Sequence, residues 1–209
     1  MIHILIADDH MVVRKGLKQI LVEEFADAHI EEASNGTELL KMIVSEKWDI
    51  IISDLSMPGR SGLDVLKQVK LDFPKLPILI LSMHPEDQYA IRVLKAGASG
   101  YLTKESAPDE LVKAVRHILN GRKYITESIA EKLASGINLD NNESLHASLS
   151  DREFAVLKLI ASGKTVSEVA EILSLSVPTI STYRARILEK MNMKTNAELT
   201  HYAIENKLV

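Results

Sequence analysis

The first 120 residues alternate five short, almost continuously apolar runs with five amphipathic stretches of helical periodicity. The apolar runs cover 2–7, 29–34, 49–53, 77–81 and 99–101, and the helical stretches cover 11–24, 36–46, 62–71, 86–96 and 108–119. Uninterrupted apolar runs are typical of strands buried on both faces. Five strand–helix units in sequence predict a doubly wound, flavodoxin-like α/β domain with a five-stranded parallel sheet. Its functional groups should then lie at the carboxyl ends of the strands.

A different pattern follows residue 121. One helix is expected over 126–135, and the polar, Asn-rich segment 136–146 reads as a linker. From 147 to 209 only helical signals remain, which predicts a small all-α domain of four helices. A three-residue turn at 174–176 joins the second and third of these helices, as in a helix-turn-helix. The predicted limits are therefore 1–121, 122–146 and 147–209.

The composition excludes several classes of protein. The chain has no cysteine, which rules out a disulfide scaffold, thiolate catalysis and Cys-based zinc fingers. It shows no signal-peptide pattern and no apolar run near the length of a membrane span, so we expect a cytoplasmic protein without a membrane partner. The net charge of −4 divides into −5 for 1–147 and +1 for 148–209. The acidic excess thus belongs to the first domain.

Polar side chains follow the apolar runs where the strands of the predicted sheet end. Asp8 and Asp9 follow the first run, Asp54 the third and Ser82 the fourth, and Lys104 comes soon after the fifth. Three carboxylates gathered in one cleft repel one another unless a cation lies among them, and hard oxygen ligands favour Mg²⁺, with Mn²⁺ as the alternative ion. One carboxylate could then attack a phosphoryl group while the metal and the lysine stabilise charge on the transferring oxygens.

Residues 1 to about 120 resemble the receiver domain of bacterial two-component response regulators. The motifs that carry the resemblance are Asp8-Asp9, Asp54 with Met57-Pro58-Gly59, Ser82, and Lys104 after Gly100-Tyr101. The resemblance implies that Asp54 accepts a phosphoryl group from a sensor histidine kinase. It also implies that Asp9, Asp54 and the backbone carbonyl of Ser56 coordinate Mg²⁺, with Asp8 assisting through water.

The same resemblance assigns the remaining groups of the site. Lys104 contacts the phosphoryl oxygens, Ser82 moves inward to bond the phosphate, and Tyr101 follows by a change of rotamer. Many receivers have proline after this lysine, whereas this chain has Glu105. A cis bond before a residue other than proline is costly, so no obligatory cis geometry is expected here.

The third helix of the tail has one apolar and one polar face. Helical spacing predicts an inner face formed by Val177, Ile180, Ile187, Leu188 and Met191. Arg184 falls close to that face and should reach outward at its edge. The outer and flanking positions include Thr179, Ser181, Thr182, Ala185, Arg186 and Lys190. Small polar side chains beside cations suit contacts with DNA bases and phosphates.

Segments 149–157, 161–164, 168–170 and 176–181 look like the LuxR-type helix-turn-helix of NarL/FixJ regulators. The resemblance implies that the third helix reads DNA bases through Ser181, Thr182 and Ala185, and that the fourth helix supports dimerisation. Thr179, Arg184, Arg186 and Lys190 complete the expected contact set. The run 181–186 is similar to the subgroup of capsule and virulence regulators of the RcsB and BvgA type.

Together these patterns predict a phosphorylation-activated transcription regulator whose partners are a sensor histidine kinase, promoter DNA, a second copy of the chain and RNA polymerase. We expect it not to be a turnover enzyme. Two alternatives remain open. A Mg²⁺-dependent phosphatase of the haloacid-dehalogenase type would need a second Asp two residues after the nucleophile, where this chain has Ser56. A regulator acting by protein contact alone would incorporate no phosphate from acetyl phosphate.

Overall fold

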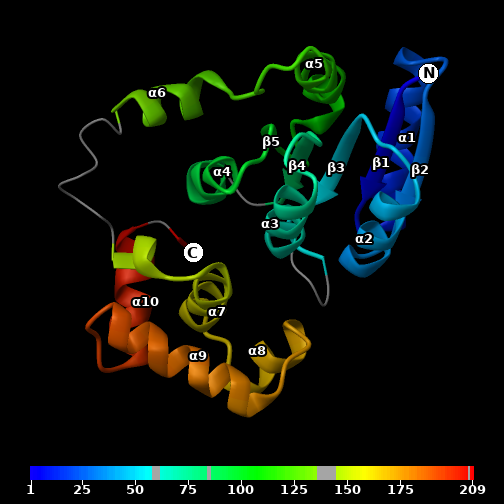
Figure 1. The fold of residues 1–209 in the computed structure, drawn as a ribbon. Coiled ribbons are helices and arrows are strands. Elements are labelled where there is room, and N and C mark those ends of the chain that lie inside the picture. Colours follow the sequence, from blue (N-terminus) through cyan, green and yellow to red (C-terminus); the bar gives the residue numbers. More distant parts are fainter. Residues whose placement is uncertain (58–61, 84–85, 136–144, 207) are drawn as a thin grey trace. The chain divides into compact units, whose positions relative to one another are not determined.

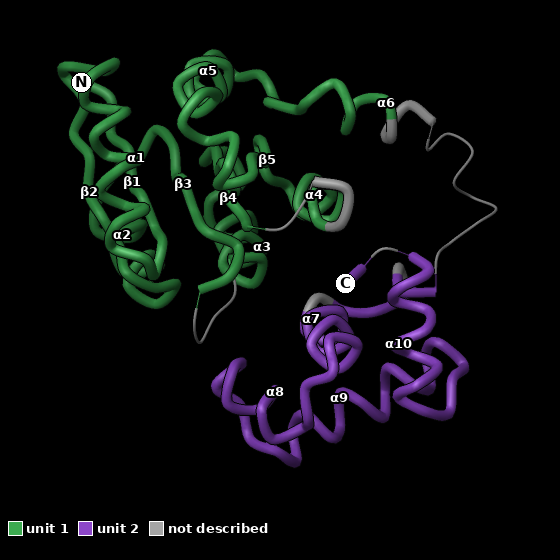
Figure 2. Tube along the Cα trace, turned by 180° about the vertical axis from the view of Figure 1, so that it is seen from behind, with its two compact units in different colours: residues 1–134 green, residues 135–209 purple. Residues whose placement is uncertain are grey.

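The protein is described as a computed structural model covering residues 1–209 except 58–61, 84–85, 136–144 and 207. It forms two compact units, residues 1–134 and residues 135–209 (Figure 2). Within the described ranges no helix has both the length and the apolar character needed to cross a membrane.

Unit 1 is built on a parallel five-stranded sheet in the order β2-β1-β3-β4-β5 (Figure 1). The strands are β1 His3–Ala7, β2 His29–Ala33, β3 Ile50–Asp54, β4 Ile78–Ser82 and β5 Gly100–Thr103. Every residue of β3 and β4 is buried, as the continuous apolar runs predict. The doubly wound fold is confirmed. Three strands end slightly later than predicted, because Asp54, Ser82 and Thr103 are the last residues of β3, β4 and β5 and still pair with a neighbouring strand.

Helices follow each strand of the sheet in turn. They are α1 Met11–Glu24, α2 Gly36–Ser45, α3 Gly62–Asp72, α4 Glu86–Lys95 and α5 Ala107–Leu119. Helices α1 and α5 contact each other, and their buried side chains share one apolar core with β1, β3 and β4. This packing fixes the strands relative to one another, so their carboxyl ends form a stable rim for polar groups.

The first unit extends beyond residue 121. The Tyr124 N–H donates to the Ser99 carbonyl oxygen at 2.8 Å, and Tyr124 forms a β-bridge with Gly100. Ile129 is buried in helix α6 (Glu127–Ser135), which matches the helix expected over 126–135. The chain just after α5 is therefore attached to the edge of the sheet through Tyr124. The linker at 136–146 falls mostly outside the described residues.

Unit 2 consists of helices only in its described residues. They are the 3-10 helix η2 Leu145–Ser148 and the helices α7 Asp151–Ala161, α8 Val166–Ile172, α9 Val177–Lys190 and α10 Asn196–Glu205. Capping boxes open α7 at Ser150 and α8 at Thr165, where the third residue of each helix is a glutamate. The turn between α8 and α9 contains Ser174 at a φ of 52°, and the Ser176 side chain accepts from the Thr179 N–H. These features confirm the predicted helix-turn-helix.

The glycine that opens α3 lies against the last residue of β3. A Cβ atom at Gly62 would lie 2.1 Å from the Asp54 carbonyl oxygen and 2.8 Å from Leu55 Cα. Both contacts are backbone atoms of the strand end, so Gly62→Ala should destabilise unit 1 by about 1–3 kcal/mol. Gly16→Ala is the matched control, because a Cβ there meets nothing within 4 Å and alanine favours the middle of α1 by roughly 0.5–1 kcal/mol.

Urea unfolding checks this pair of variants through the fluorescence of Trp48, the one tryptophan of the chain, which is buried in unit 1. Gly62→Ala should move the midpoint to lower urea and Gly16→Ala to higher urea. A midpoint for Gly62→Ala at or above that of the wild type would contradict the close approach of α3 to β3.

Candidate functional site

Two carboxylates and one amine meet at the carboxyl ends of the central strands. Lys104 Nζ lies 2.6 Å from Asp8 Oδ2 and 3.0 Å from Asp54 Oδ2. The side chains are 8% exposed for Lys104, 1% for Asp8 and 2% for Asp54. Such a degree of burial makes the pairing obligatory, since an unpaired charge is costly away from water. These three residues converge in the structure, as predicted.

The surroundings shift the pKa values of both partners. Burial raises the pKa of Asp54 above its usual range and the Asp8 carboxylate adds to this, although Lys104 and the Ser56 N–H oppose it. For Lys104, burial alone would lower the pKa, but hydrogen bonds and charge from Asp8 and Asp54 outweigh it and the pKa is raised. The lysine therefore stays protonated and holds the two carboxylates together.

Asp9 and His10 complete the acidic group. His10 was not among the site residues expected from the sequence. Asp8, Asp9, His10 and Asp54 each offer a ligand atom, and these atoms lie within 4.8 Å of one another. His10 Nδ1 is 2.8 Å from Asp9 Oδ1, and the His10 N–H donates to Asp8 Oδ1 at 2.8 Å. The one sequence feature that could have indicated a role for His10 is its position directly after the Asp pair. Ser56 lies beside Asp54, with its N–H donating to Asp54 Oδ1 at 3.2 Å.

The donor set suits a hard divalent cation. Three carboxylates face a single ammonium group, so a negative charge remains that Lys104 cannot neutralise. Mg²⁺ and Mn²⁺ prefer carboxylate, carbonyl and water oxygens. The Asp8, Asp9 and Asp54 side chains meet that preference.

The two residues expected to act as a switch are both buried, in the two strands β4 and β5. Ser82 is buried at the end of β4, and its carbonyl oxygen accepts from the Lys104 N–H at 2.8 Å. Tyr101 is fully buried in β5. The Lys104–Glu105 bond is trans, as are the other described peptide bonds. Of the motif behind Asp54, Met57 is buried, whereas Pro58 and Gly59 lie outside the described residues.

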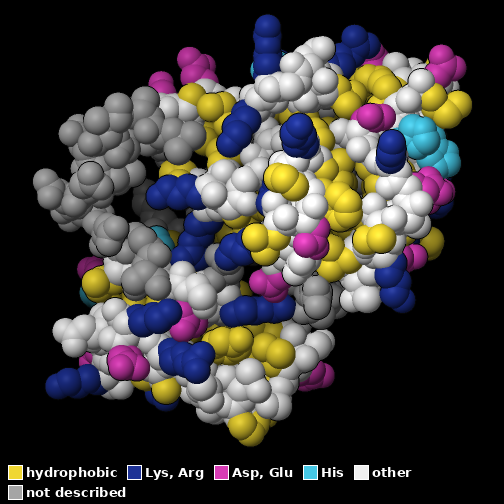
Figure 3. All heavy atoms as spheres, in the orientation of Figure 1, with side chains coloured by type: hydrophobic (Ala, Val, Ile, Leu, Met, Phe, Trp, Pro, Cys, Tyr) yellow, Lys and Arg dark blue, Asp and Glu magenta, His cyan; other side chains and the backbone are white. Residues whose placement is uncertain are grey.

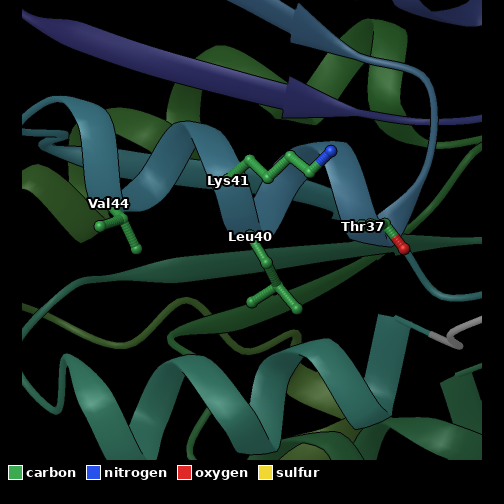
Figure 4. A pocket seen from close by; sticks show the side chains of 4 residues that line it. All are labelled: Thr37, Leu40, Lys41 and Val44. Carbon is green, nitrogen blue, oxygen red and sulfur yellow. The ribbon is translucent and has the colours of Figure 1, made fainter.

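A separate hollow lies along α2, lined by Thr37, Leu40, Lys41 and Val44 (Figure 4). Leu40 and Val44 point to the same side of the helix, and Lys41 lies along its outer surface. Among the described residues that line the hollow, none is acidic and none belongs to the acidic group. The hollow does not compete with that group as a site for phosphoryl chemistry.

In unit 2, the inner face of α9 is largely as predicted. Ile180, Ile187 and Met191 are buried and Leu188 is half-buried, which confirms their expected positions. The expectation for Val177 is wrong, because its side chain is 45% exposed. Val177 is the first residue of the helix, and side chains tilt toward the helix N-terminus. Its side chain therefore projects past the turns that pack against α7 and α8.

The α9 residues expected to contact DNA differ in exposure and in whether their side chains already have hydrogen-bond partners within unit 2. Ser181, Thr182, Ala185 and Arg186 are exposed, on a unit whose visible face carries Lys and Arg side chains among Asp and Glu (Figure 3). Several side chains have partners within unit 2. Thr179 Oγ1 lies 2.7 Å from Ser176 Oγ, Thr182 Oγ1 donates to the Pro178 carbonyl oxygen at 3.0 Å, and Arg184 Nε donates to Asn196 Oδ1 at 2.6 Å.

Lys190 is bound to the carboxylate that caps α7. Its Nζ donates to Glu153 Oε2 at 2.6 Å, and the same oxygen accepts from the Ser150 N–H at 2.7 Å. Burial alone would raise the pKa of Glu153, but the hydrogen bonds from Lys190 and Ser150 outweigh it and the pKa is lowered. Lys190 thus ties the end of α9 to the start of α7. This role of Lys190 could not be predicted from helical spacing, because the two partners are 37 residues apart in the sequence.

Both units match known families. Residues 4–116 match the response regulator receiver domain, and residues 147–203 match the bacterial regulatory proteins of the luxR family. The response regulator UvrY of Escherichia coli K12 is 38% identical over 209 residues, covering 100% of this chain and 96% of that protein.

Solved structures of RcsB resemble the chain along almost its whole length. RcsB from Salmonella enterica serovar Typhimurium, bound to promoter rprA with the phosphomimetic BeF₃⁻, has a TM-score of 0.66 at 29% identity and covers 97% of this chain and 98% of its own. A structure of two RcsB dimers bound to two parallel DNAs has a TM-score of 0.59 at 30% identity, with 96% and 97% covered. The chain therefore belongs to the two-component response regulators of the NarL/FixJ type, with a receiver domain and a LuxR-type DNA-binding domain.

Proposed function

We propose that Asp54 is the phospho-acceptor of this regulator and that a sensor histidine kinase is the donor. The observation that carries the proposal is the bridge from Lys104 Nζ to both Asp54 and Asp8 inside a buried rim. It places a cation where negative charge develops on a transferring phosphoryl group. Membership of the response regulators supports the choice of donor.

Asp8, Asp9, Asp54 and the Ser56 backbone carbonyl would hold Mg²⁺, with Mn²⁺ as a substitute. The cluster of carboxylate oxygens supports this assignment. Bound there, the ion supplies positive charge to the phosphoryl oxygens and lowers the repulsion among the carboxylates. His10 lies at the exposed edge of the cluster, where its imidazole contacts Asp9.

The transfer exchanges one bond to phosphorus for another. An Asp54 carboxylate oxygen attacks phosphorus, the bond from phosphorus to the kinase imidazole breaks, and that imidazole nitrogen keeps the electron pair. The product is an acyl phosphate on Asp54. Lys104 exchanges a carboxylate oxygen for a phosphoryl oxygen, and Ser82 and Tyr101 rearrange to bond and follow the phosphate. The chain would then act as a signalling partner and not as a turnover enzyme, because Ser56 stands where a phosphatase of the haloacid-dehalogenase type would need its second Asp.

In unit 2, Ser181, Thr182 and Ala185 would contact base edges and Arg186 a phosphate. Their exposure on α9 supports these roles, as does the promoter-bound state of the RcsB relative. Thr179, Arg184 and Lys190 would contact DNA after exchanging or sharing their present partners. Dimerisation on phosphorylation supplies a second α9, and RNA polymerase is the further partner at the promoter. A DNA target and a kinase donor place the regulator in the cytoplasm.

The proposed limits of the parts are 1–121 for the receiver domain, 122–146 for the linker with its helix and 147–209 for the DNA-binding domain. The matched family ranges of 4–116 and 147–203 support them. The bridge from Tyr124 to Gly100 supports a linker whose first residues are anchored to the sheet of the receiver domain.

Asp54→Asn should abolish phosphate incorporation from acetyl phosphate in the presence of Mg²⁺, because an amide oxygen is a poor nucleophile. Asp27→Asn, at an exposed turn, is the matched control and should incorporate phosphate like the wild type. Intact-mass spectrometry reads the added phosphoryl group directly. Full incorporation into Asp54→Asn would place the acceptor at another residue.

The raised pKa of Asp54 predicts an effect on stability in the absence of divalent metal. A carboxyl group whose pKa is higher in the folded than in the unfolded chain lowers stability as pH rises through those two values. At pH 7 with EDTA, Asp54→Asn should therefore unfold at higher urea than the wild type. The difference should shrink when Mg²⁺ is added, since the ion favours the ionised carboxylates. A lower urea midpoint for Asp54→Asn than for the wild type in EDTA would contradict a destabilising effect of the ionised Asp54 carboxylate.

Arg186 and Lys190 should differ in their effects on DNA binding. Arg186→Ala should reduce the slope of log affinity against log salt by about one phosphate contact. Lys190→Met should chiefly destabilise unit 2, by about 1–3 kcal/mol, because the buried Glu153 carboxylate then loses one hydrogen-bond donor but keeps the Ser150 N–H, and the lysine is 40% exposed. Fluorescence anisotropy at several salt concentrations measures the slope, and thermal unfolding measures the stability. Equal salt slopes for Arg186→Ala and the wild type would remove Arg186 from the interface.

A further inference from the structure

Two histidines and a glutamate lie together at the end of unit 1 opposite to the acidic group. His3 opens β1 and His29 opens β2, and the two are direct partners in the parallel register. Glu46 is the residue that ends α2. Figure 3 shows histidine side chains side by side at the end of unit 1 where the N-terminus lies in Figure 1. Five-residue strands place this cluster about 15 Å from the acidic group.

The three side chains offer ligand atoms at close range. One atom from each of His3, His29 and Glu46 lies within 4.8 Å of the others, and the two imidazole rings have centroids 5.1 Å apart. Ligand atoms around a tetrahedral zinc ion are about 3.4 Å apart, because the Zn–N distance is about 2.0–2.1 Å. A contraction of about 1 Å, within the reach of side-chain rotation, would bring the three groups to that spacing.

One imidazole nitrogen of the cluster lacks a protein partner. His3 Nδ1 is buried and makes no hydrogen bond among the described residues. Buried polar atoms in folded proteins nearly always have a partner, so this atom points to a missing ligand or solvent group. Trp48 stacks on the His29 ring and meets the His3 ring edge-on, and these ring contacts leave His3 Nδ1 without a hydrogen bond among the described residues.

We propose that His3, His29 and Glu46 form a binding site for a late first-row transition-metal ion, with Zn²⁺ as the ion expected. Imidazole suits Zn²⁺, Cu²⁺ and Ni²⁺, whereas Mg²⁺ prefers oxygen ligands. Two histidines and a carboxylate are a common ligand set for a zinc ion that keeps one open position. The two ends of the sheet would thus select different cations.

The surroundings of the cluster suit a cation. Glu31 Oε1 lies 3.3 Å from His29 Nε2 and supplies a second negative charge, and Asp49 Oδ2 accepts from the His3 backbone N–H at 2.8 Å. The His29 and Glu46 side chains are 40% and 47% exposed, which leaves an entry path from solvent. Trp48 covers the other side and is itself held by a hydrogen bond from its Nε1 to the Met42 carbonyl oxygen.

Trp48 makes the test direct, because it is the one tryptophan in the chain and contacts both imidazoles. The experiment uses the tag-free full chain with saturating Mg²⁺, so that the acidic group is already filled. Cu²⁺ or Ni²⁺ should quench Trp48 fluorescence in a saturable way, and Zn²⁺ should reverse the quenching by competition. Calorimetry with Zn²⁺ should give one site per chain.

His29→Gln and Glu46→Gln should each weaken Zn²⁺ binding at least tenfold and reduce the quenching. Glu46 lies on the exposed end of α2, so its variant keeps the fold even if the strand variant does not, and circular dichroism verifies both. His201→Gln is the matched control: His201 pairs with Glu205 on exposed α10, and its loss should leave the Trp48 response unchanged. His10→Gln separates out any ion held at the acidic group.

Two results would overturn the proposal. One is the absence of saturable quenching and of Zn²⁺ binding in the wild type. The other is an affinity of correctly folded Glu46→Gln and His29→Gln equal to that of the wild type. In either case the cluster is an aromatic stack that closes the end of the sheet. Because these readouts involve no phosphorylation, they do not depend on the proposed role of Asp54.

Discussion

Burial of Asp8 and Asp54 beside a single lysine is the interaction on which the arrangement of unit 1 depends. The continuous apolar strands place both carboxylates at the sheet's rim, and Lys104 joins them at 2.6 and 3.0 Å. Burial raises the pKa of Asp54, so the ionised form is held at a cost. A divalent cation or a phosphoryl group each changes the charge that the rim must balance. The balance of charge at the rim is thus the property on which the proposed cation binding and phosphorylation both depend.

Unit 2 uses a related pairing for a different purpose. Glu153 caps α7 and receives Lys190 from the end of α9, so the helix expected to read DNA is fixed to the body of the domain. Arg184 is likewise bonded to Asn196 at the start of α10. These two cations hold α9 in place, whereas Arg186 is exposed on its outer side. In unit 2, Arg184 and Lys190 thus help to orient the helix, and Arg186 is exposed beside them.

Most of the fold and the core of the site could be predicted from the sequence. Apolar runs buried on both faces gave the strands, and helical spacing with Ser150 and Ser176 as caps gave the helices. Convergence of Asp8, Asp54 and Lys104 followed from the geometry of parallel sheets. The features that could not be predicted depend on contacts between residues far apart in the sequence. They are the partner of Lys190, the bridge from Tyr124 to Gly100 and the pairing of His3 with His29. The exposure of Val177 could not be predicted either, because helical spacing does not mark where packing stops at a helix end.

The central claim is that a phosphoryl group on Asp54 increases the affinity of unit 2 for DNA. Fluorescence anisotropy of a DNA fragment selected by the protein tests it, with wild type and Asp54→Asn each titrated with and without acetyl phosphate and Mg²⁺. Acetyl phosphate should shift the binding curve of the wild type to lower protein concentration and leave that of Asp54→Asn unchanged. Superimposable curves for the wild type in the two conditions, with phosphorylation verified by mass, would contradict the account.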